Sequence, residues 1–575
     1  MKKLIFGHQE KLYFLVGLVV TLSLLWPLFW APSFTYHDDV QTIRLFEMDK
    51  CIRDLQIPCR WVPDLGGIYG YPLFNYYAPL PYYFGELFYF ISHSLLISVK
   101  VMFATAMVGS FVFMYLLGRK LWGNKGGAIS AVFYSFAPYH AVDFYVRGEM
   151  GEMWGLMFFP AIFWAILRLK EAPRIYNLLL VALFVALILA SHNLSAMLFL
   201  PIAVVFAGFL FFQKRDSKFA KLFLLSIILG LTMSAFYWLP MNAEKNLVHI
   251  ETMVEGYFSY TEHFKGLKKL FVERYWGWGP SVREIPGIQE DNMLSYQIGW
   301  VHILGWLLSL LTAVKLWRTK RSVSLLVAFS SLAILGTVFM INPYSAFVWK
   351  LVDPLKYLQF PWRFLLLTIF FISMISGSIF LWLEGKKQLF IWLGLLVLVI
   401  ALNFSYFRPE KFLQVTDAQI LSGKDWDREI KRSIFDFLPI FAKEPPAELA
   451  TARYQTLYGD IKVSNFREGT NWFSFNADTN GYSIIRISQY YFPDWRIFVD
   501  GQQAHIQYTD NSLGLMTLIL GTGQHHIEGR LENTTVRTLS NGVSGLGMLA
   551  FILLILTQVP KTRHWIFYYL KGMYR

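Results

Sequence analysis

Long apolar blocks separated by short polar segments dominate the pattern of this chain. The first block, "LYFLVGLVVTLSLLWPLFWA" at residues 12–31, is long enough to cross a bilayer, because about 20 apolar residues suffice. The chain opens with "MKK" before this block, as a secretory signal does, but the block is too long and lacks a convincing small-residue cleavage site. We therefore expect a retained first transmembrane helix.

Basic residues collect in short segments between the later blocks, and their distribution predicts the topology. By the positive-inside rule these segments face the cytoplasm, so the alternation predicts about twelve transmembrane helices in the plasma (inner) membrane, with both termini cytoplasmic. The aromatic-rich stretch at 79–96 is then a helix in the membrane interface, because a crossing there would put Arg119 and Lys120 outside. The basic segments are "GRKLWGNK" (118–125), "RLKEAPR" (168–174), "QKRDSKFAK" (213–221), "KLWRTKR" (315–321) and "EGKK" (384–387).

The segments on the extracytoplasmic side are longer, and the last of them has the pattern of a separate domain. Its stretch "YSIIRISQYYFPDWRIFVDGQQAHIQY" alternates apolar and polar residues around Asp500-Gly501, a hairpin turn signal. We expect a small antiparallel, sandwich-like β-domain outside the membrane. The predicted division is a polytopic α-helical transmembrane domain (1–406) with a first outer loop (32–96), an outer β-rich domain (407–538), and a final anchoring helix with a basic cytoplasmic tail (539–575).

The composition supports a membrane protein and excludes several other classes. The chain is 55% hydrophobic and 16% charged, whereas soluble proteins carry about 25% charged residues. Its net charge of +13 is distributed over the segments between apolar blocks, so no continuous basic face indicates a nucleic-acid partner. The sequence has no phosphate-binding GK[ST] loop, no HExxH and no paired CxxC, so nothing indicates ATP hydrolysis or a zinc site.

The only two cysteines, Cys51 and Cys59, both lie in the predicted first outer loop. On one continuous helix they would be about 12 Å apart, too far for a disulfide. Pro58 should break such a helix, so a disulfide can form if the loop lies in an oxidising compartment. Two free thiols are an equally good interpretation of the sequence.

The first outer loop also carries the clearest candidate chemistry. His37, Asp38 and Asp39 follow the first helix directly. A carboxylate beside a groove between helices can take a proton from an attacking hydroxyl, and burial can tune its pKa for this role. Alternatively, Asp39 can hold a divalent cation such as Mg²⁺ or Mn²⁺ against a phosphate, because hard cations prefer oxygen ligands. Acids are also common in any polar loop after a helix.

Aromatic residues follow the acids and indicate a substrate groove. Trp61, Tyr71 and Tyr76 lie among turn-forming Gly and Pro residues, and such rings can contact a sugar or line a groove for a lipid chain. An aromatic belt at the membrane interface would explain the rings but not the turns. His192 in "SHNLSA" is a further groove candidate, although an ordinary interfacial histidine fits equally.

Several basic residues lie in segments predicted to be extracytoplasmic, although basic residues of membrane proteins usually lie on the cytoplasmic side. The planar fork of Arg147 can bind a phosphate, and Glu152 can orient it. Arg363, Lys356 and Arg274 are the other candidates for contact with an anionic lipid headgroup. A local salt bridge at the helix end, or snorkelling, would explain the same residues without a ligand.

The order of these pieces resembles the GT-C superfamily of membrane glycosyltransferases. The resemblance rests on the acidic first outer loop, the interfacial helix beginning "PLPYYF" and the returning helix ending "YLLGRKLWG". It is closer to membrane proteins described as 6-pyruvoyl-tetrahydropterin-synthase-related, akin to the YfhO-like proteins. The pieces of that likeness are "HDD", "PCRWVPDLGGIYGYPLFNYYAPLPYY", "YVRGEMGE", "SHNLSA", "RYWGWGPS", "LQFPWRF" and "YFPDWRIFVDG".

The resemblance implies that the protein transfers a sugar from a polyprenyl-phosphate donor to an extracytoplasmic acceptor, which is a glycan, a lipid or a protein. The donor is embedded in the membrane lipid. The catalytic acid of the family falls on Asp38 or Asp39, and Asp38 is preferred because the family pattern begins His-Asp. Arg147 and Glu152 match the family's outer "RG…E" element, and Arg363 matches its "WRF". The alternative function is a lipid-linked-glycan transporter or an envelope assembly factor, which would use the same groove and cations without a base.

The outer β-domain carries no predicted catalytic residue. His525 and His526 are adjacent, so on a strand they point to opposite faces and cannot converge on one metal. The domain is expected to recognise the acceptor or to cover the groove. Tyr490, Tyr491, Phe492 and Trp495 form either a sugar-binding edge or the aromatic core of the domain.

Overall fold

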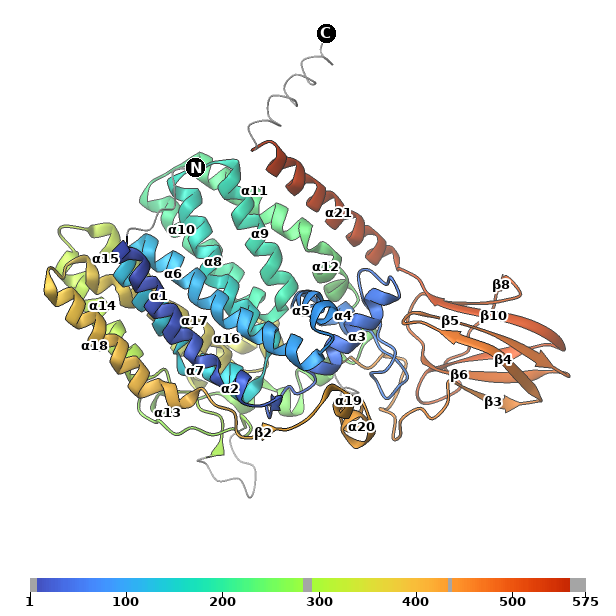
Figure 1. The fold of residues 1–575 in the computed structure, drawn as a ribbon. Coiled ribbons are helices and arrows are strands. Elements are labelled where there is room, and N and C mark those ends of the chain that lie inside the picture. The colour runs from blue at the N-terminus through green and yellow to red at the C-terminus, as the bar shows by residue number, and fades with distance from the viewer. Residues whose placement is uncertain (1–7, 283–291, 433–436, 559–575) are drawn as a thin grey trace, which may run out of the picture.

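A computed structural model describes residues 8–282, 292–432 and 437–558. A helical bundle makes up most of the molecule, and a separate β-domain lies at one end of it (Figure 1). The final helix, α21 (Thr535–Leu556), runs along the bundle from the β-domain. The chain is therefore a multi-pass membrane protein with a carboxyl-terminal β-domain and one last apolar helix, as the sequence predicts.

The described residues contain eight helices that are long and apolar enough to cross a membrane. One further pair, α11 and α12, passes the same test together across a 73° bend, and two shorter helices, α9 and α14, are also apolar. The helices of the bundle are α1 (His8–Leu22), α2 (Trp26–Trp30), α6 (Leu95–Ser135), α8 (Met150–Glu171), α9 (Ile175–Ser191), α10 (Asn193–Gln213), α11 (Ser217–Met233), α12 (Ala235–Ala243), α14 (Trp300–Leu316), α15 (Arg321–Ile341), α17 (Leu365–Ser376) and α18 (Lys386–Asn403).

The 41-residue helix α6 is a hairpin of two antiparallel arms. Gly123 has non-helical angles (φ 76°, ψ −177°) and breaks it. A Cβ added at Gly118 would lie 2.9 Å from the Cβ of Ser130, whereas a straight helix would separate these residues by about 18 Å. The described residues give the predicted number of about twelve crossings if the two arms of α6 count separately, the bent pair counts as one span, and the shorter helices α9 and α14 are included.

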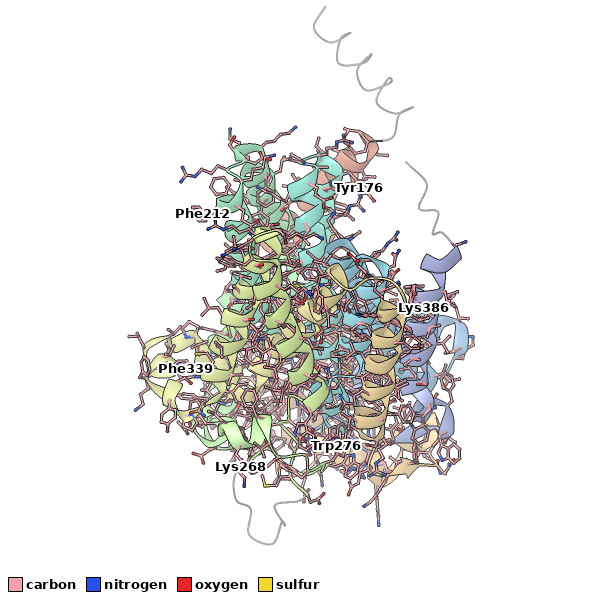
Figure 2. All side chains as sticks on the ribbon, turned by 90° about the vertical axis from the view of Figure 1, so that its left-hand side faces the viewer. Tyr176, Phe212, Lys268, Trp276, Phe339 and Lys386 are labelled. Atoms are coloured by element: carbon pink, nitrogen blue, oxygen red, sulfur yellow. A yellow bond between two sulfur atoms is a disulfide. The ribbon has the colours of Figure 1, made fainter. Side chains whose placement is uncertain are left out.

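Contacts at one end of the bundle bring the predicted cytoplasmic segments together. Lys120 forms an ion pair with Glu171, and Lys170 donates to the carbonyl of Lys214 at 2.6 Å. Lys125 donates to the side chain of Gln388 at 2.6 Å. Figure 2 shows Tyr176 and Phe212 at this upper end, and Lys268 and Trp276 at the opposite end. The alternation deduced from the basic segments is thus reproduced by the packing.

The first outer loop packs against the other end of the bundle through three short helices: α3 (Gln41–Arg53), α4 (Leu73–Tyr76) and α5 (Leu80–Ser92). Helix α5 buries Tyr82 and Gly85 against α3 and α6, whereas Leu87, Phe90 and Ile91 are exposed. This two-sided character is typical of a helix in the membrane interface, as predicted for 79–96. Cys51 and Cys59 form a disulfide with a Cα–Cα distance of 5.5 Å, which decides between the two interpretations of the sequence.

The β-domain is a sandwich of two antiparallel sheets. One sheet has the strand order β4-β5-β10-β7-β8 and the other β3-β6-β9. Tyr454 of the smaller sheet stacks on Phe475 of the larger at 6.4 Å between ring centroids, so the sheets pack face to face. Their strands are β3 (Tyr454–Tyr458), β4 (Ile461–Glu468), β5 (Trp472–Thr479), β6 (Ser483–Tyr490), β7 (Trp495–Val499), β8 (Gln502–Gln503), β9 (Leu515–Leu520) and β10 (Gly523–Leu531).

The predicted hairpin at Asp500-Gly501 joins β7 to β8. Both residues have positive φ (51° and 79°), the geometry that Asp-Gly favours in a two-residue turn. Val499 pairs with Gln502, which fixes the register. His525 contacts Asp500 at 2.8 Å and His526 contacts Asn476 at 2.7 Å, so the two histidines have separate partners, as their adjacency on a strand predicts.

The aromatic residues of 490–495 are mostly core, which corrects the alternative of a sugar-binding edge. Tyr490 and Phe492 are fully buried and Trp495 is 4% exposed. Phe492 and Trp495 pack against Trp61 of the first loop, with ring centroids 5.8 and 5.9 Å away. Only Tyr491 lies partly open, stacked on Tyr508 at 3.9 Å. These rings therefore attach the β-domain to the first loop.

The segment between α18 and the sandwich crosses the first loop before it reaches the β-domain. Strand β2 (Phe412–Leu413) pairs with β1 (Ser33–Phe34), just ahead of Asp38. Asp417 of α19 (Asp417–Ile420) accepts from the backbone of Leu95 and Leu96 at the start of α6. Helix α20 (Gly423–Arg432) follows, and the chain then runs past the outer end of the bundle.

Candidate active site

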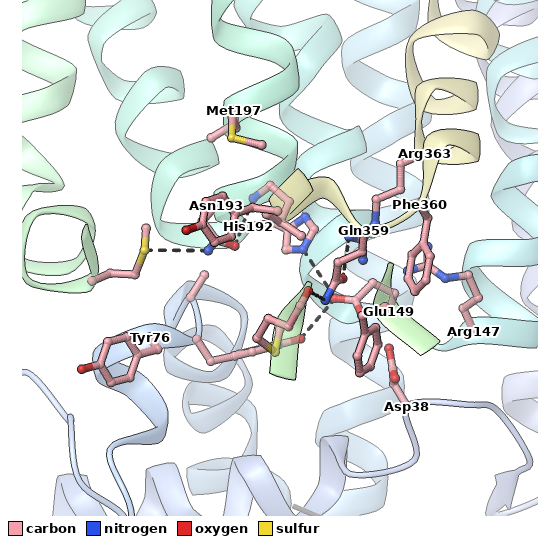
Figure 3. A pocket seen from close by; sticks show the side chains of 18 of the residues that line it. Asp38, Tyr76, Arg147, Glu149, His192, Asn193, Met197, Gln359, Phe360 and Arg363 are labelled. Carbon is pink, nitrogen blue, oxygen red and sulfur yellow. Dashed lines mark hydrogen bonds and ion pairs between the residues drawn. The ribbon is translucent and has the colours of Figure 1, made fainter. Parts of the chain in front are cut away.

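An open cavity of about 970 Å³ lies at the end of the bundle where the predicted extracytoplasmic segments meet. Its walls come from the first loop, the start of α8, the α9–α10 corner, the bent α11–α12 pair, the segment before α17, and Phe437 (Figure 3). The sequence-predicted residues that line it are His37, Asp38, Tyr76, Arg147, His192 and Arg363.

Backbone pairing places Asp38 beside the start of α8. The amides of His37 and Asp38 donate to the carbonyls of Val146 and Arg147, each at 2.9 Å. The next residue, Gly148, has φ +64°, and a Cβ there would lie 2.2 Å from the ring of Tyr36. Only glycine permits both this conformation and this approach, so Gly148 allows the first loop to lie against the turn that carries Glu149.

Asp38 and Glu149 then meet inside the cavity. Their carboxyl groups hydrogen-bond to each other, which requires that one proton be shared by the two acids. The hydroxyl of Tyr77 donates to Glu149 Oε1 at 3.2 Å, and His192 Nε2 lies 3.8 Å from the same oxygen. A proton held between the two carboxyl groups relieves their mutual repulsion.

The surroundings assign the proton to Asp38. Burial, the charge of Glu149 and the hydrogen bond to Glu149 all raise the pKa of Asp38 well above its ordinary value. Burial alone would raise the pKa of Glu149, but the hydrogen bond from Asp38 and the nearby His192, Arg147 and Arg363 together lower it. Glu149 is thus the ionised partner, and Asp38 is a carboxyl group that binds protons strongly.

Arg147 and Arg363 converge on one buried carboxylate beside this pair. Glu152, which is fully buried, contacts Arg147 Nη1 through Oε1 at 2.9 Å and Arg363 Nε through Oε2 at 3.1 Å. Arg147 also contacts Asp143 at 2.6 Å, and Arg363 donates to Gln359 at 3.1 Å. Both guanidinium groups line the cavity, whereas Glu152 lies behind them and orients both.

Aromatic rings hold these cations from the other side. The guanidinium of Arg147 lies 4.9 Å from the Trp362 ring, and that of Arg363 lies 4.9 Å from the Phe360 ring. A third buried arginine, Arg44, lies 4.0 Å from the ring of Tyr77 and also lines the cavity. The cavity therefore presents three fixed cations to an occupant, and guanidinium groups suit phosphate oxygens.

Both histidines of the cavity are neutral neighbours of the charged groups. His192 Nδ1 accepts from the amide of Ser195, so its proton lies on Nε2, toward Glu149. Burial lowers the pKa of His192 to about 4. His37 donates from Nε2 to the carbonyl of Trp278 at 2.7 Å, and burial lowers its pKa as well.

Apolar side chains form the part of the cavity that lies against the helices. They come from α10 and from the two arms of the bent pair, whose 73° bend opens the wall here. Such a lining suits an extended hydrocarbon chain. The residues are Leu194, Met197, Leu200, Pro201, Leu231, Trp238 and Met241.

Six sequence-predicted site residues are absent from the described lining of the cavity: Glu152, which lies behind the two arginines, and five others. Trp61 and Tyr71 are buried in the packing of the first loop against the outer domain and Phe437. Lys356 is partly exposed and paired with Asp353 at 2.8 Å, and Arg274 contacts Tyr406 at 3.2 Å. Asp39 lies apart from Asp38, where its charge acts on Tyr36 and Arg428.

The cavity residues that were not among the predicted site residues include Glu149, Arg44 and Gln359. Glu149 stands two residues after Arg147 in "RGE", so its proximity to a predicted cation was a usable signal. Arg44 has no comparable signal, whereas Gln359 lies in the stretch "LQFPWRF", four residues before Arg363.

The divalent cation expected at Asp39 stays a prediction. No group of three or more His, Cys, Asp or Glu side chains in the described parts of the chain is placed to hold a metal ion. The two acids in the cavity, Asp38 and Glu149, are bound to each other through a proton. We therefore derive no step through a cation.

Residues 77–238, which include most of the cavity's helical wall, match the family described as "Dolichyl-phosphate-mannose-protein mannosyltransferase". An uncharacterised protein of Lactococcus lactis subsp. cremoris (strain MG1363) is 22% identical over 240 residues, which cover 40% of this chain and 39% of that protein. The likeness to 6-pyruvoyl-tetrahydropterin-synthase-related and YfhO-like proteins stays a prediction.

Two solved structures are similar to this chain. The arabinofuranosyltransferase AftD from Mycobacteria has 14% sequence identity and a TM-score of 0.43, and the match covers 70% of this chain and 27% of AftD. The archaeal oligosaccharyltransferase AglB from Archaeoglobus fulgidus, in complex with an inhibitory peptide and a dolichol-phosphate, has 11% identity and a TM-score of 0.40, with coverage of 73% and 57%. The chain thus spans less than two thirds of the length of each of these relatives.

Proposed function

We propose that this protein is a membrane glycosyltransferase that moves a sugar from a polyprenyl-phosphate donor to an acceptor on the extracytoplasmic face. One observation carries the proposal: a carboxyl group with raised proton affinity, Asp38, faces the same cavity as the paired guanidinium groups of Arg147 and Arg363. The match of residues 77–238 to a mannosyltransferase family that uses a dolichyl-phosphate donor supports the donor class.

The proposed donor has two parts with opposite chemistry, and the cavity offers a region for each. The apolar wall of α10, α11 and α12 takes the first isoprene units of the lipid. The phosphate lies at Arg147 and Arg363, whose orientation is fixed by Glu152. The sugar then lies between the phosphate and Asp38.

The proposed reaction is an inverting displacement at the anomeric carbon. The acceptor hydroxyl oxygen forms the new bond to this carbon while the bond to the phosphate oxygen breaks. The electron pair of that bond passes to the polyprenyl phosphate, whose added negative charge the two guanidinium groups stabilise. The hydroxyl proton passes to Asp38 as general base.

Asp38 can accept this proton only after it has lost the proton it shares with Glu149. Once ionised, it is a stronger base than an ordinary carboxylate, because the same surroundings that raise its pKa favour reprotonation. Glu149 keeps one negative charge beside it, and His192 and Tyr77 hold Glu149 in place. Glu149 is thus proposed as a positioning residue that sets the proton affinity of Asp38.

The orientation in the membrane is part of the proposal. The cavity and the β-domain lie on the outer face of the plasma membrane, and both termini are cytoplasmic. The basic segments gathered at the opposite end of the bundle support this orientation. The disulfide between Cys51 and Cys59 in the first loop supports it as well, because disulfides persist in oxidising compartments.

The deciding experiment incubates the purified full-length protein with a radiolabelled polyprenyl-phosphate sugar and an extract of envelope acceptors. Native protein should consume the donor, and the Asp38→Asn variant should bind it without consuming it. If the native protein binds the lipid but never releases polyprenyl phosphate, the alternative holds, and the protein is a lipid-linked-glycan transporter or assembly factor. Mass spectrometry of co-purified lipids identifies the donor.

A further inference from the structure

A second, smaller cavity of about 180 Å³ lies where the first loop, the β-domain and the final helix α21 meet. Its lining is mostly polar, and it is separate from the central cavity in position and residues. The first loop contributes the turn that follows α3, and α21 contributes its first turn. The lining residues are Leu55, Gln56, Ile57, Pro58, Arg60, Asn471, Leu531, Glu532, Asn533 and Arg537.

Arg60 is buried in this cavity wall and only partly satisfied. It is 5% exposed. Its Nη1 donates to Asn75 at 3.0 Å, and its Nη2 donates to the carbonyl of Phe236 and to Asn541, both at 2.9 Å. The Nε atom is buried without a hydrogen-bond partner among the described residues. These partners are neutral, so the charge of Arg60 has no direct counterion.

Arg537 is the second buried cation of the wall. It is 1% exposed and lies on the first turn of α21. Its Nε donates to Glu244 Oε2 at 2.9 Å, and its guanidinium lies 5.0 Å from the ring of Phe492. Its Nη2 is buried and has no hydrogen-bond acceptor in the part of the chain that the structure describes.

Of the two guanidinium groups only that of Arg537 contacts a carboxylate, Glu244, so the wall carries a net positive charge. Burial, and then the charge of Arg537, lower the pKa of Arg60 to about 10, while Glu244 acts in the opposite direction. The other acid at the cavity, Glu532, is already paired with Arg496 at 3.2 Å and Arg530 at 3.0 Å. A buried cation without a counterion is costly, so an anion would stabilise this wall.

The surroundings of the cavity place it at the membrane surface. Leu55 and Ile57, which flank it, are 82% and 68% exposed. Helix α21, which is long and apolar enough to cross a membrane, starts beside it and has Leu539 and Leu546 exposed on its surface. Exposed apolar side chains next to buried cations are the arrangement that a lipid headgroup region would contact.

We propose that this cavity is a binding site for a phosphate-type oxyanion, held by Arg60 and Arg537 where the first loop, the β-domain and α21 meet. The phosphate comes from the headgroup of an anionic membrane lipid or from free phosphate. An occupant joins the three elements through charge-assisted hydrogen bonds. It also acts on the central cavity, because Asn75 and Glu244 connect these arginines to Tyr76, whose hydroxyl donates to the Glu244 carbonyl at 2.7 Å.

The test supplies the negative charge from the protein itself. Asn471→Asp places a carboxylate on the cavity wall, and Asn465→Asp, in the exposed bulge of β4, is the matched control. Full-length protein in detergent is dialysed against radiolabelled phosphate at constant ionic strength. Native protein and the control should bind about one more phosphate per chain than Asn471→Asp, because the new carboxylate takes the place of the ion. Asn533→Asp, on the same wall, repeats the test if Asn471→Asp does not fold.

The second arm distinguishes the two sources. The same proteins are exposed to micelles containing phosphatidylglycerol or diacylglycerol with identical chains, and retained lipid is counted by native mass spectrometry. Retention of phosphatidylglycerol alone, reduced at least tenfold in Asn471→Asp, assigns the site to a lipid headgroup. Phosphate binding without lipid retention assigns it to the free ion. If native protein, Asn471→Asp and Asn465→Asp bind equal amounts of both probes, the site does not exist.

Discussion

Asp38 and Glu149 hydrogen-bond to each other through their carboxyl groups, although one belongs to the first outer loop and the other to the start of α8. Two adjacent carboxylates would repel each other, so the contact depends on one shared proton. This pair explains why a chain leaving the membrane at once presents acids. Asp38 has a partner deep in the bundle, whereas Asp39 acts on Tyr36 and Arg428 outside the cavity.

Replacement of Asp38 should remove transfer without removing the donor site. Asp38→Asn keeps the size of the side chain and its contact with Glu149 but cannot accept a proton, so we expect kcat to fall about 10²- to 10⁴-fold. Asp39→Asn should cost far less, and Asp353→Asn, an exposed control, should change nothing. Equal losses for Asp38→Asn and Asp39→Asn would remove the base assignment.

The rate of sugar transfer should rise with pH, because Asp38 can act as a base only after it has lost its proton. Because the pKa of Asp38 is raised, Asp38 stays protonated above the ordinary carboxyl range of about 4 and becomes a base only at higher pH. In Glu149→Gln the neighbouring negative charge is gone, so the pKa of Asp38 falls and the rise in kcat/KM moves to lower pH. A pH profile of kcat/KM that is the same in both proteins would contradict the coupling.

Loss of either cavity cation should weaken stabilisation of the leaving phosphate. Arg147→Gln or Arg363→Gln is expected to lower kcat about 10²- to 10³-fold, as loss of one charged donor does elsewhere. Lys356→Gln, which removes a partly exposed cation near the same face, is the control. Steady-state kinetics with a short-chain polyprenyl-phosphate sugar measures kcat for the arginine variants and for the lysine control. A loss for Lys356→Gln as large as for Arg363→Gln would place the phosphate elsewhere.

Glu152 should matter for stability as well as for activity. It is fully buried between two guanidinium groups, and Glu152→Gln would leave both with a neutral neighbour. We expect a destabilisation of about 3–5 kcal/mol, the usual cost of breaking a buried ion pair from one side. Thermal unfolding in detergent, with and without donor lipid, measures it. An unchanged unfolding temperature would mean that the arginines are held by other groups.

Phe437 offers a direct test of the outer segment's role at the cavity. Its ring stacks on Tyr76 at 5.6 Å and lines the cavity, so Phe437→Ala should raise the KM for the acceptor while donor binding is unchanged. Phe441→Ala, whose ring contacts Tyr491 and Tyr508 instead, is the control. A point variant is preferable to deletion of 410–535, because the sandwich also holds the first loop through Trp61.

The membrane orientation can be tested with protease on sealed vesicles of known sidedness. The region 407–538 should be cut only from the extracytoplasmic face, because it follows the odd-numbered crossing α18 in the alternation. Thiol labelling after reduction gives an independent measurement, since Cys51 and Cys59 should react from the same face. Cleavage of the sandwich from the cytoplasmic face alone would invert the topology.

The sequence alone determined the multi-pass helical architecture and the carboxyl-terminal β-domain, because the signals for both are local. The length of an apolar run, a basic segment and the Asp500-Gly501 turn each depend on residues that are close together in sequence. The structure contains the apolar helices and the turn where the sequence predicts them. The gathering of outer segments at one end of the bundle follows from that alternation. For the same reason Asp38, Arg147 and Arg363 could be assigned to one end of the molecule before any distance was known.

Only the tertiary structure decided which of the outer charges act together. From the sequence, Lys356 and Arg274 are candidates for phosphate binding as strong as Arg363. Of these three, only Arg363 contacts the buried Glu152, while Lys356 pairs with Asp353 at the surface. Likewise the partner of Asp38 depends on Gly148, whose missing side chain lets the first loop approach α8. A close approach between segments far apart in the chain is a property of packing, because it depends on the shapes of both surfaces and not on the residues of either segment alone.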